Sequence, residues 1–323
     1  ASDGVRRFRE LVSVTKYKPI SVFNGLDFDG PPDGFCFTDE YIFCPGVREP
    51  DDAFLTGCAC AATAEDNRAV ACCVPGGGCR CLEDAEGLVN YTAEGLINVE
   101  RTSIVECNKR CACSLATCPN RVVERGRKVS LEIYKTRRKG WGVRAMEYIP
   151  RGTYIDKYAG EVITSEEAEA RGRRYDATGL TYLFDLDGSC ELKNPASKSL
   201  LMAKGRATRR SGRWLTFSVL SAQPFHPHLP VLFLYPFPPI VVRRQVDASR
   251  YGNVTHFFNH SCDPNLVVYP VFRHPDRRIH DLAFFAKKNI TRCTELTFDY
   301  QMKNTAKRTK CECKTSKCRG WVQ

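Results

Sequence analysis

The stretch Cys107-Asn-Lys-Arg-Cys111-Ala-Cys113-Ser-Leu-Ala-Thr-Cys118 decides how this chain folds. Upstream of it stand three close pairs, Cys58-x-Cys60, Cys72-Cys73 and Cys79-x-Cys81, so that residues 58–118 hold ten of the 18 cysteines. Thiols one residue apart cannot close an unstrained disulfide with each other, but they can face one metal ion, and zinc takes four such ligands tetrahedrally. The cluster therefore predicts zinc, with a disulfide framework as the alternative.

The number of thiols indicates the kind of cluster. Three separate tetrahedral zinc ions need twelve thiolates, whereas nine suffice if three sulfurs each bridge two ions. Ten cysteines fit a nine-ligand cluster of three ions with one spare, either Cys72 or Cys73, and the spacing to Cys79 favours Cys73 as the ligand. The expected ligands are Cys58, Cys60, Cys73, Cys79, Cys81, Cys107, Cys111, Cys113 and Cys118. A module with so little apolar core obtains most of its folding free energy from the metal.

A second group, Cys311-x-Cys313-xxxx-Cys318, lies at the C-terminal end and offers only three thiols. A tetrahedral zinc site there needs a fourth ligand from elsewhere in the chain. The cysteines outside both sets are expected to be buried or free thiols without a role: Cys36, Cys44, Cys72, Cys190 and Cys293.

The composition is that of a globular protein, with 43% apolar and 26% charged residues in 323, which excludes disorder throughout. The net charge of +11 comes largely from Gly188–Gln245, where nine basic residues minus one acidic residue give +8. This Pro- and Arg-rich segment is either a surface loop, a DNA-contacting arm or a translated intron. Its apolar stretch Leu229–Val242 contains four prolines and is shorter than the roughly 20 residues of a membrane span, so no membrane segment is expected. The chain begins at Ala1 rather than Met, as expected for a fragment with an upstream domain.

Short runs of alternating apolar residues separated by glycine predict a mostly β domain after residue 122. Thr164-Ser165-Glu166-Glu167 is a capping-box start for a short helix that ends near Arg174. Tyr154–Tyr158 and Glu161–Ile163 are predicted to pair with each other as strands. Further strands are predicted at 129–134, 182–186, 282–286 and 295–300.

Three motifs in order resemble the SET-domain protein lysine methyltransferases: Gly140-Trp141-Gly142, then Asn259-His260-Ser261-Cys262-Asp263-Pro264-Asn265, then Glu295-Leu296-Thr297-Phe298-Asp299-Tyr300. The nine-cysteine module resembles a pre-SET domain and the C-terminal cysteines a post-SET segment. This combination is similar to the Su(var)3-9 class, which methylates lysine 9 of histone H3. The resemblance implies a β-clip SET fold with a pseudoknot joining the Asn259 and Tyr300 motifs, preceded by a trinuclear-zinc pre-SET module and followed by a zinc-binding post-SET tail.

The implied organisation is an N-terminal segment at 1–18, a pre-SET domain at 19–121 with its zinc cluster at 58–118, a SET domain at 122–301 and a post-SET segment at 307–323. The SET domain carries an atypical insert at 188–245. The resemblance makes Cys262 the fourth ligand beside Cys311, Cys313 and Cys318, for a total of three zinc ions in the pre-SET module and one in the post-SET segment.

The resemblance also implies roles for individual residues. Residues that would contact S-adenosylmethionine are Gly140, Trp141, Gly142, Tyr182, Asn259, His260 and Trp321. Trp321 would also cover the lysine channel. Tyr300 and Tyr158 would position the amine, and Phe298 would leave space for a methylated one.

The implied function is S-adenosylmethionine-dependent methylation of a histone H3 tail lysine, lysine 9 by analogy and up to trimethyl, in heterochromatin formation and gene silencing. The implied location is chromatin in the nucleus, with the H3 tail or nucleosome and heterochromatin adaptor proteins as partners and direct DNA contact only weakly suggested by the basic insert. One alternative is a catalytically silent SET-fold protein that binds chromatin, and another is a zinc-dependent nucleic-acid binder.

Overall fold

The computed structural model describes residues 2–60, 73, 79–83, 89–97, 103–178, 182–186, 244–301 and 309–322, with backbone only at 176–178. The chain divides into two compact units, Ala1–Cys190 with Arg243–Gln323, and Glu191–Val242. The second unit lies outside the described residues, and so does Leu229–Val242. In the described part of the chain, every helix is too short or too polar to span a membrane.

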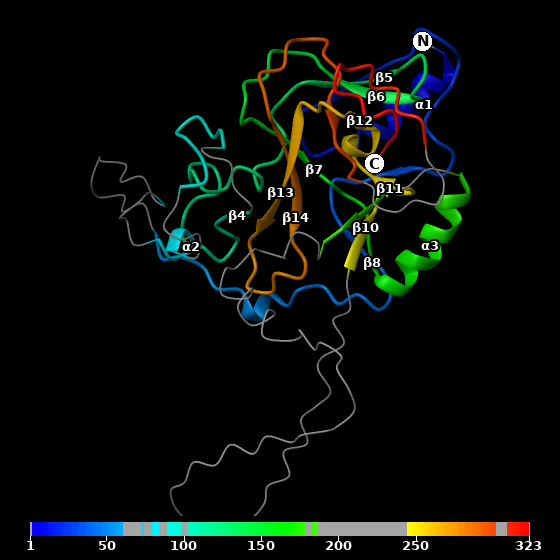
Figure 1. Ribbon diagram of the computed structural model, residues 1–323. Helices are drawn as coiled ribbons and strands as arrows, with labels where there is room; N and C mark the ends of the chain where they lie inside the picture. The colour runs from blue at the N-terminus through cyan, green and yellow to red at the C-terminus, as the bar shows by residue number, and fades with distance from the viewer. Residues whose placement is uncertain are drawn as a thin grey trace, which may run out of the picture. The chain divides into compact units, whose positions relative to one another are not determined.

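The regular secondary structure of the described residues consists mostly of β-strands, as the sequence predicts (Figure 1). The strands are β1 (Ile20–Phe23), β2 (Cys36–Phe37), β3 (Ile42–Phe43), β4 (Ile104–Val105), β5 (Leu131–Lys135), β6 (Trp141–Ala145), β7 (Tyr154–Lys157), β8 (Glu161–Thr164), β9 (Leu183–Asp185), β10 (Arg244–Asp247), β11 (Tyr251–Gly252), β12 (Asn259–His260), β13 (Leu266–Phe272), β14 (Asp281–Ala286) and β15 (Thr297–Phe298). The helices are α1 (Asp3–Val12), α2 (Arg80–Glu83) and α3 (Ser165–Thr178), with 3-10 turns η1 (Asp52–Phe54) and η2 (Val254–Phe257).

These strands form several small sheets. The larger ones have the orders β4-β13-β14-β7, β3-β8-β10-β9 and β1-β5-β6, and two-stranded sheets pair β11 with β2 and β12 with β15. In the β12–β15 pair, Asn259 lies opposite Thr297 and His260 opposite Phe298. The two motifs that the pseudoknot was predicted to join are therefore hydrogen-bonded neighbours.

Strands β7 and β8 were predicted to pair with each other, and this prediction was wrong. β7 pairs antiparallel with β14, whereas β8 pairs with β10 and β3 in another sheet. The predicted helix after β8 is present as α3, with the Glu167 amide donating to Thr164 Oγ1 at 3.4 Å. In Figure 1 this helix lies beside β8 and β10.

The first 50 residues are built into the fold more deeply than their sequence indicated. Helix α1 begins at the N-cap Ser2, whose hydroxyl accepts from the Val5 amide, and it buries Val5, Phe8 and Val12 in the core. After it, β1, β2 and β3 each pair in parallel with a strand much later in the chain, namely β5, β11 and β8.

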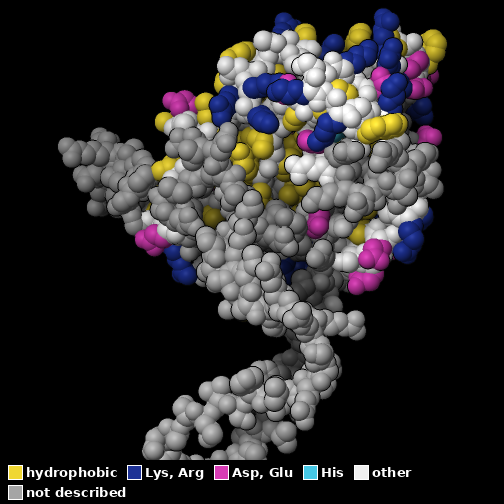
Figure 2. All heavy atoms as spheres, in the orientation of Figure 1, with side chains coloured by type: hydrophobic (Ala, Val, Ile, Leu, Met, Phe, Trp, Pro, Cys, Tyr) yellow, Lys and Arg dark blue, Asp and Glu magenta, His cyan; other side chains and the backbone are white. Residues whose placement is uncertain are grey.

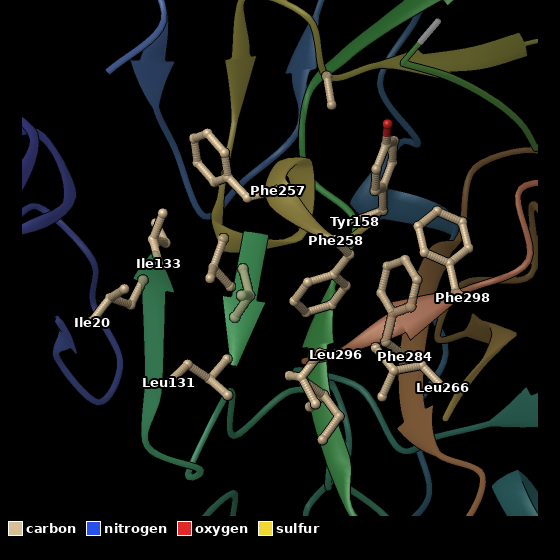
Figure 3. Close-up of a cluster of buried hydrophobic side chains, with 14 of the residues drawn as sticks. Ile20, Leu131, Ile133, Tyr158, Phe257, Phe258, Leu266, Phe284, Leu296 and Phe298 are labelled. Atoms are coloured by element: carbon tan, nitrogen blue, oxygen red, sulfur yellow. The ribbon is translucent and has the colours of Figure 1, made fainter. Parts of the chain in front are cut away.

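The largest apolar cluster lies between these sheets, and part of it is drawn in Figure 3. Phe258, Phe284 and Leu266 are fully buried there. The cluster continues into Tyr158 and Phe298, which are 5% and 8% exposed, so two predicted site residues belong to the rim of the core. Burial on this scale gives the site rigid walls.

Candidate active site and metal centres

The pre-SET cysteines form three overlapping groups of four, called quartets below. Within each quartet, the sulfur atoms all lie within 4.8 Å of one another. The quartets are Cys58, Cys73, Cys79 and Cys107; Cys58, Cys81, Cys107 and Cys111; and Cys73, Cys107, Cys113 and Cys118. All eight of these residues are buried. Cys58, Cys73 and Cys107 belong to more than one quartet, which is the arrangement expected of bridging thiolates in a trinuclear cluster.

Cys60 belongs to none of the quartets, but it is partly buried and packs against the cluster. Cys72, the other candidate for the spare thiol, lies outside the described residues. Cys73, which the spacing favoured, takes part in two quartets.

Backbone amides help to hold the pre-SET sulfurs in place. Cys111 Sγ accepts from the amides of Cys58 at 3.4 Å and Asn108 at 3.2 Å. Hydrogen bonds from Cys107 and Cys81 lower the pKa of Cys111, which favours the thiolate form that binds metal. Clustered soft sulfur donors suit zinc.

The C-terminal quartet consists of Cys262, Cys311, Cys313 and Cys318, whose sulfurs also lie within 4.8 Å of one another. Cys262 lies two residues after the end of β12, so the quartet fastens the tail next to the strand that carries Asn259 and His260. Two ion pairs reinforce the attachment, Lys317 with Asp263 at 3.2 Å and Arg319 with Asp299 at 2.7 Å. The four residues that the resemblance grouped are thus brought together.

The hydroxyls of Tyr158 and Tyr300 are both fixed on backbone carbonyls. Tyr158 donates to the Tyr182 carbonyl at 2.6 Å, and Tyr300 donates to the Phe258 carbonyl at 2.7 Å. Burial raises the pKa of both phenols above the usual value of 10. At neutral pH these groups therefore act as neutral dipoles in fixed positions and do not act as bases.

Phe298 lies in an aromatic wall, with Phe284 and Tyr158 nearby (Figure 3). Its ring centroid is 4.7 Å from that of Tyr300, 5.0 Å from Phe284 and 6.4 Å from Phe184. Tyr158 packs on the same two phenylalanines, at 5.4 Å from Phe184 and 6.4 Å from Phe284. The three residues predicted to act on the amine therefore share one apolar, aromatic environment.

Tyr182 is held by a residue that the sequence analysis did not single out. The His256 ring stacks on Tyr182 with centroids 4.3 Å apart and planes 10° apart, and His256 Nδ1 lies 2.7 Å from the Ala248 carbonyl. Burial lowers the pKa of His256 to about 4. The signal available in the sequence was a polar residue within the apolar run Val254–Phe258, directly before the Asn259 motif.

The glycine turn and Asn259, which were both predicted to contact the cofactor, are hydrogen-bonded to each other. Asn259 Nδ2 donates to the Trp141 carbonyl at 3.1 Å and to Glu295 Oε1 at 2.9 Å. A Cβ on Gly142 would lie 2.9 Å from Asn259 Nδ2, and Gly140 has φ of +67°, so both positions favour glycine. Residues of β6 and β12 are thus in direct contact at Gly142, whereas the space beside Gly140 is open.

A cavity of about 570 Å³ opens beside Gly140, with Lys135, Arg137 and Arg138 in its lining. Figure 2 shows Lys and Arg side chains gathered on the part of this face where β5 and β6 lie in Figure 1. Ion pairs offset part of this charge, because Lys135 contacts Asp29 and Arg138 contacts Glu312.

Trp321 is 40% exposed and forms a backbone bridge with Lys310. Its predicted position over the lysine channel stays a prediction.

Comparison with known proteins identifies the class first. Residues 140–301 match the SET domain and residues 13–121 match the pre-SET motif. The chain is 35% identical over 98% of its length to a Schizosaccharomyces pombe protein named as an H3 lysine-9-specific histone-lysine N-methyltransferase, and it spans 57% of that relative.

Two solved structures support the same conclusion. The Neurospora SET-domain protein DIM-5, a histone lysine methyltransferase, is 34% identical, with 91% of this chain and 99% of that one covered and a TM-score of 0.63. Arabidopsis thaliana SUVH6, solved in complex with SAM, is 29% identical, with 97% and 55% covered and a TM-score of 0.68. The chain therefore belongs to the Su(var)3-9 family of SET-domain histone-lysine N-methyltransferases.

Proposed function

We propose that this chain transfers methyl groups from S-adenosylmethionine to a lysine of the histone H3 tail. The observation that supports this most directly is the placement of Tyr158 and Tyr300, whose hydroxyls are fixed on carbonyls beside the apolar Phe298 ring. A relative of 35% identity is named as H3 lysine-9 specific, which makes lysine 9 the proposed target.

The bound cofactor would supply an electrophilic methyl group on a sulfonium. The protein has to align the lysine nitrogen with that carbon, because the nitrogen lone pair forms the new bond as the carbon–sulfur bond breaks. An ammonium has no lone pair, and the aromatic surroundings of Phe298 disfavour the charged form of the amine. Because the tyrosines remain protonated, the proton leaves to solvent while their oxygens and the nearby carbonyls orient the amine.

The residues proposed to hold the cofactor are Gly140, Trp141, Gly142, Tyr182, Asn259, His260 and Trp321. The contact between Asn259 and the glycine turn supports this placement. Strand β9, which begins next to Tyr182, is the last strand in the order β3-β8-β10-β9. We propose that the histone tail binds in the neighbourhood of β9, close to Tyr182.

We also propose that the chain binds four zinc ions, three in the pre-SET module and one at the C-terminal cysteines. Cys107 cannot serve three ions at once in a nine-ligand cluster, and partly buried Cys60 would take its place in the quartet of Cys58, Cys73 and Cys79. Each of Cys58, Cys73 and Cys107 then bridges two ions, as the arithmetic of nine ligands requires. The fourth ion would lie in the Cys262 quartet.

The test is methyl transfer to H3 tail peptides in which each lysine is replaced in turn, measured by mass spectrometry. We expect loss of methylation only when lysine 9 is replaced, and addition of up to three methyl groups on the intact peptide. Tyr300→Phe, which removes the hydroxyl and keeps the ring, should lower the rate. Tail binding without any transfer would instead favour the catalytically silent chromatin-binding protein.

The proposed place of action is chromatin in the nucleus, where the H3 tail of the nucleosome is the substrate and heterochromatin adaptor proteins are partners. Transfer to nucleosomes is the corresponding measurement. DNA affinity that disappears when residues 191–242 are deleted, with no methylation detectable, would favour the nucleic-acid binder.

A further inference from the structure

His260 lies between the C-terminal cysteine quartet and the backbone of Tyr300. Its side chain is buried, and both ring nitrogens have partners. The Tyr300 amide donates to Nδ1 at 3.2 Å, and Cys262 Sγ lies 3.5 Å from Nε2. One imidazole ring therefore contacts a predicted zinc ligand on one side and a predicted active-site residue on the other.

The partners determine which nitrogen carries the ring proton. A backbone N–H can only donate, so Nδ1 must act as an acceptor. The proton of the neutral ring is then on Nε2 and faces the Cys262 sulfur. Asp299 Oδ1 is 3.6 Å from Nδ1, beyond hydrogen-bond distance, and accepts instead from Arg319 at 2.7 Å. A metal-bound thiolate accepts such a hydrogen bond, and a bond of this kind fixes the orientation of a ligand.

The Tyr300 side of the contact is tightly built. The Tyr300 ring packs edge-on against His260 with centroids 5.3 Å apart, and its hydroxyl is fixed on the Phe258 carbonyl. The Ser261 amide donates to the Phe298 carbonyl at 3.0 Å, which keeps β12 and β15 in register around the ring. A rotation of His260 would therefore remove the acceptor of the Tyr300 amide.

We propose that His260 is a positioning residue that couples zinc occupancy of the Cys262 quartet to the placement of Tyr300. This rests on the proposed function only in that zinc fills the quartet and Tyr300 faces the amine. With zinc bound, the Cys262 thiolate accepts a hydrogen bond from His260 Nε2–H, and His260 Nδ1 accepts one from the Tyr300 amide. Without zinc, Cys262 is released from the quartet, the ring loses one partner, and the Tyr300 amide loses its acceptor.

Two substitutions of His260 separate its two contacts, because each keeps one contact and removes the other. His260→Asn places an amide near the position of Nδ1, so it keeps an acceptor for Tyr300 but does not reach Cys262. His260→Gln reaches the position of Nε2 and keeps a donor for Cys262, but it removes the ring acceptor. Cys318→Ser opens the quartet without changing Cys262, and the exposed Cys293→Ser is the matched cysteine control outside the quartets.

The measurements are zinc affinity by chelator competition and hydrogen exchange of the Tyr300 amide, neither of which requires methyl transfer. The C-terminal zinc should be the first to be removed, because its quartet is less buried than those of the pre-SET module. We expect His260→Asn to weaken this site by about 10–100-fold with Tyr300 protection kept. We expect His260→Gln to keep the affinity and to lose the protection.

The coupling itself is tested by combining variants. Cys318→Ser should accelerate Tyr300 amide exchange in the otherwise unchanged protein and have no further effect in either His260 variant, whereas Cys293→Ser should change nothing. The proposal is overturned if Cys318→Ser leaves the exchange rate of the Tyr300 amide unchanged. It is also overturned if Cys318→Ser accelerates this exchange as much in the His260 variants as in the unmodified protein. Absence of methyl transfer with these exchange results intact would overturn the proposed function alone.

Discussion

Single residues in this site act through shape and fixed dipoles. Phe298 places a ring edge, without a polar atom, among Tyr300, Phe284 and Phe184, whereas the two tyrosines have their protons committed to carbonyls. We therefore propose that the space beside Phe298 determines how large an amine the site accepts.

Replacement of Phe298 by tyrosine tests this directly. The added hydroxyl would occupy space that a methylated amine needs, so Phe298→Tyr should leave the first transfer largely intact and stop near the monomethyl product. Mass spectra of the H3 peptide measure the product distribution. The same change at Phe28, which is 87% exposed, is the control and should leave it unaltered. An unchanged trimethyl yield in Phe298→Tyr would contradict the assignment.

His256 predicts a pH dependence of stability. Its pKa is about 4 in the folded state and about 6.5 in the unfolded state, so between these values only the unfolded chain takes up the proton. The neutral, buried His256 therefore contributes its full share of the free energy of unfolding above pH 6.5. This contribution falls as the pH falls, by about 2 kcal/mol between pH 7 and pH 5. The free energy of unfolding in urea should be measured at both pH values for the unmodified protein and for His256→Phe. Acid release of metal destabilises both proteins alike, so the difference between their pH dependences gives the contribution of His256. Equal pH dependence in both would refute it.

At the scale of secondary-structure elements, helix α1 supports the glycine turn. Phe8 is fully buried and packs edge-on against Trp141 at 4.9 Å, while Trp141 Nε1 donates to the Gly30 carbonyl at 3.1 Å. The helix thereby fixes the indole of the turn that is proposed to contact the cofactor.

Truncation of Phe8 should therefore affect the cofactor site as well as the fold. We expect Phe8→Ala to cost about 3–5 kcal/mol of stability and to raise the KM for S-adenosylmethionine more than it lowers kcat. Phe8→Leu, which keeps most of the volume, should recover most of both. Val14, 63% exposed just after the helix, provides the control Val14→Ala. A stability loss with an unchanged KM would show that α1 does not support the turn.

The sequence indicated which residues of the candidate site lie close together better than it predicted the sheets. The cysteine spacing and the Asn259 and Tyr300 motifs depend on local chemistry, and the structure brings those residues together. In contrast, β2 and β3 are two residues long and take their partners from distant parts of the chain, which no local periodicity records. Helix α1 was missed although Val5, Phe8 and Val12 have helical spacing, because it follows directly on the N-terminus within a segment of only 18 residues.

For the molecule as a whole, zinc content is the first measurement. Elemental analysis of the pure, reduced protein should give four zinc atoms per chain, and about three after Cys318→Ser. Cys36→Ser, at an exposed cysteine outside the quartets, should leave four. A content far below four in the unmodified protein would contradict both cysteine assignments.

The geometry of β9 and β10 predicts that the insert is dispensable. The strands are antiparallel neighbours with Asp185 opposite Gln245, so the chain leaves and re-enters the sheet at adjacent points. β10 begins at Arg244, within the range 188–245 predicted for the insert. Replacement of residues 191–242 by a short glycine-rich connector should keep the zinc content and the methylation rate. A large loss of activity with zinc retained would assign the insert a role in substrate binding.

The parallel pairing of β1, β2 and β3 has a consequence for how the protein is made. Ile20 lies opposite Leu131, Ile42 opposite Glu161 and Cys36 opposite Tyr251, so contacts of the first 50 residues are far apart along the chain. High contact order slows folding, because long loops must close before these contacts form. During synthesis, β2 has to wait for its partner until more than 200 further residues have been added, and β1 and β3 until more than 100 have been added. Chaperones therefore have the longest time to act on this part of the nascent chain.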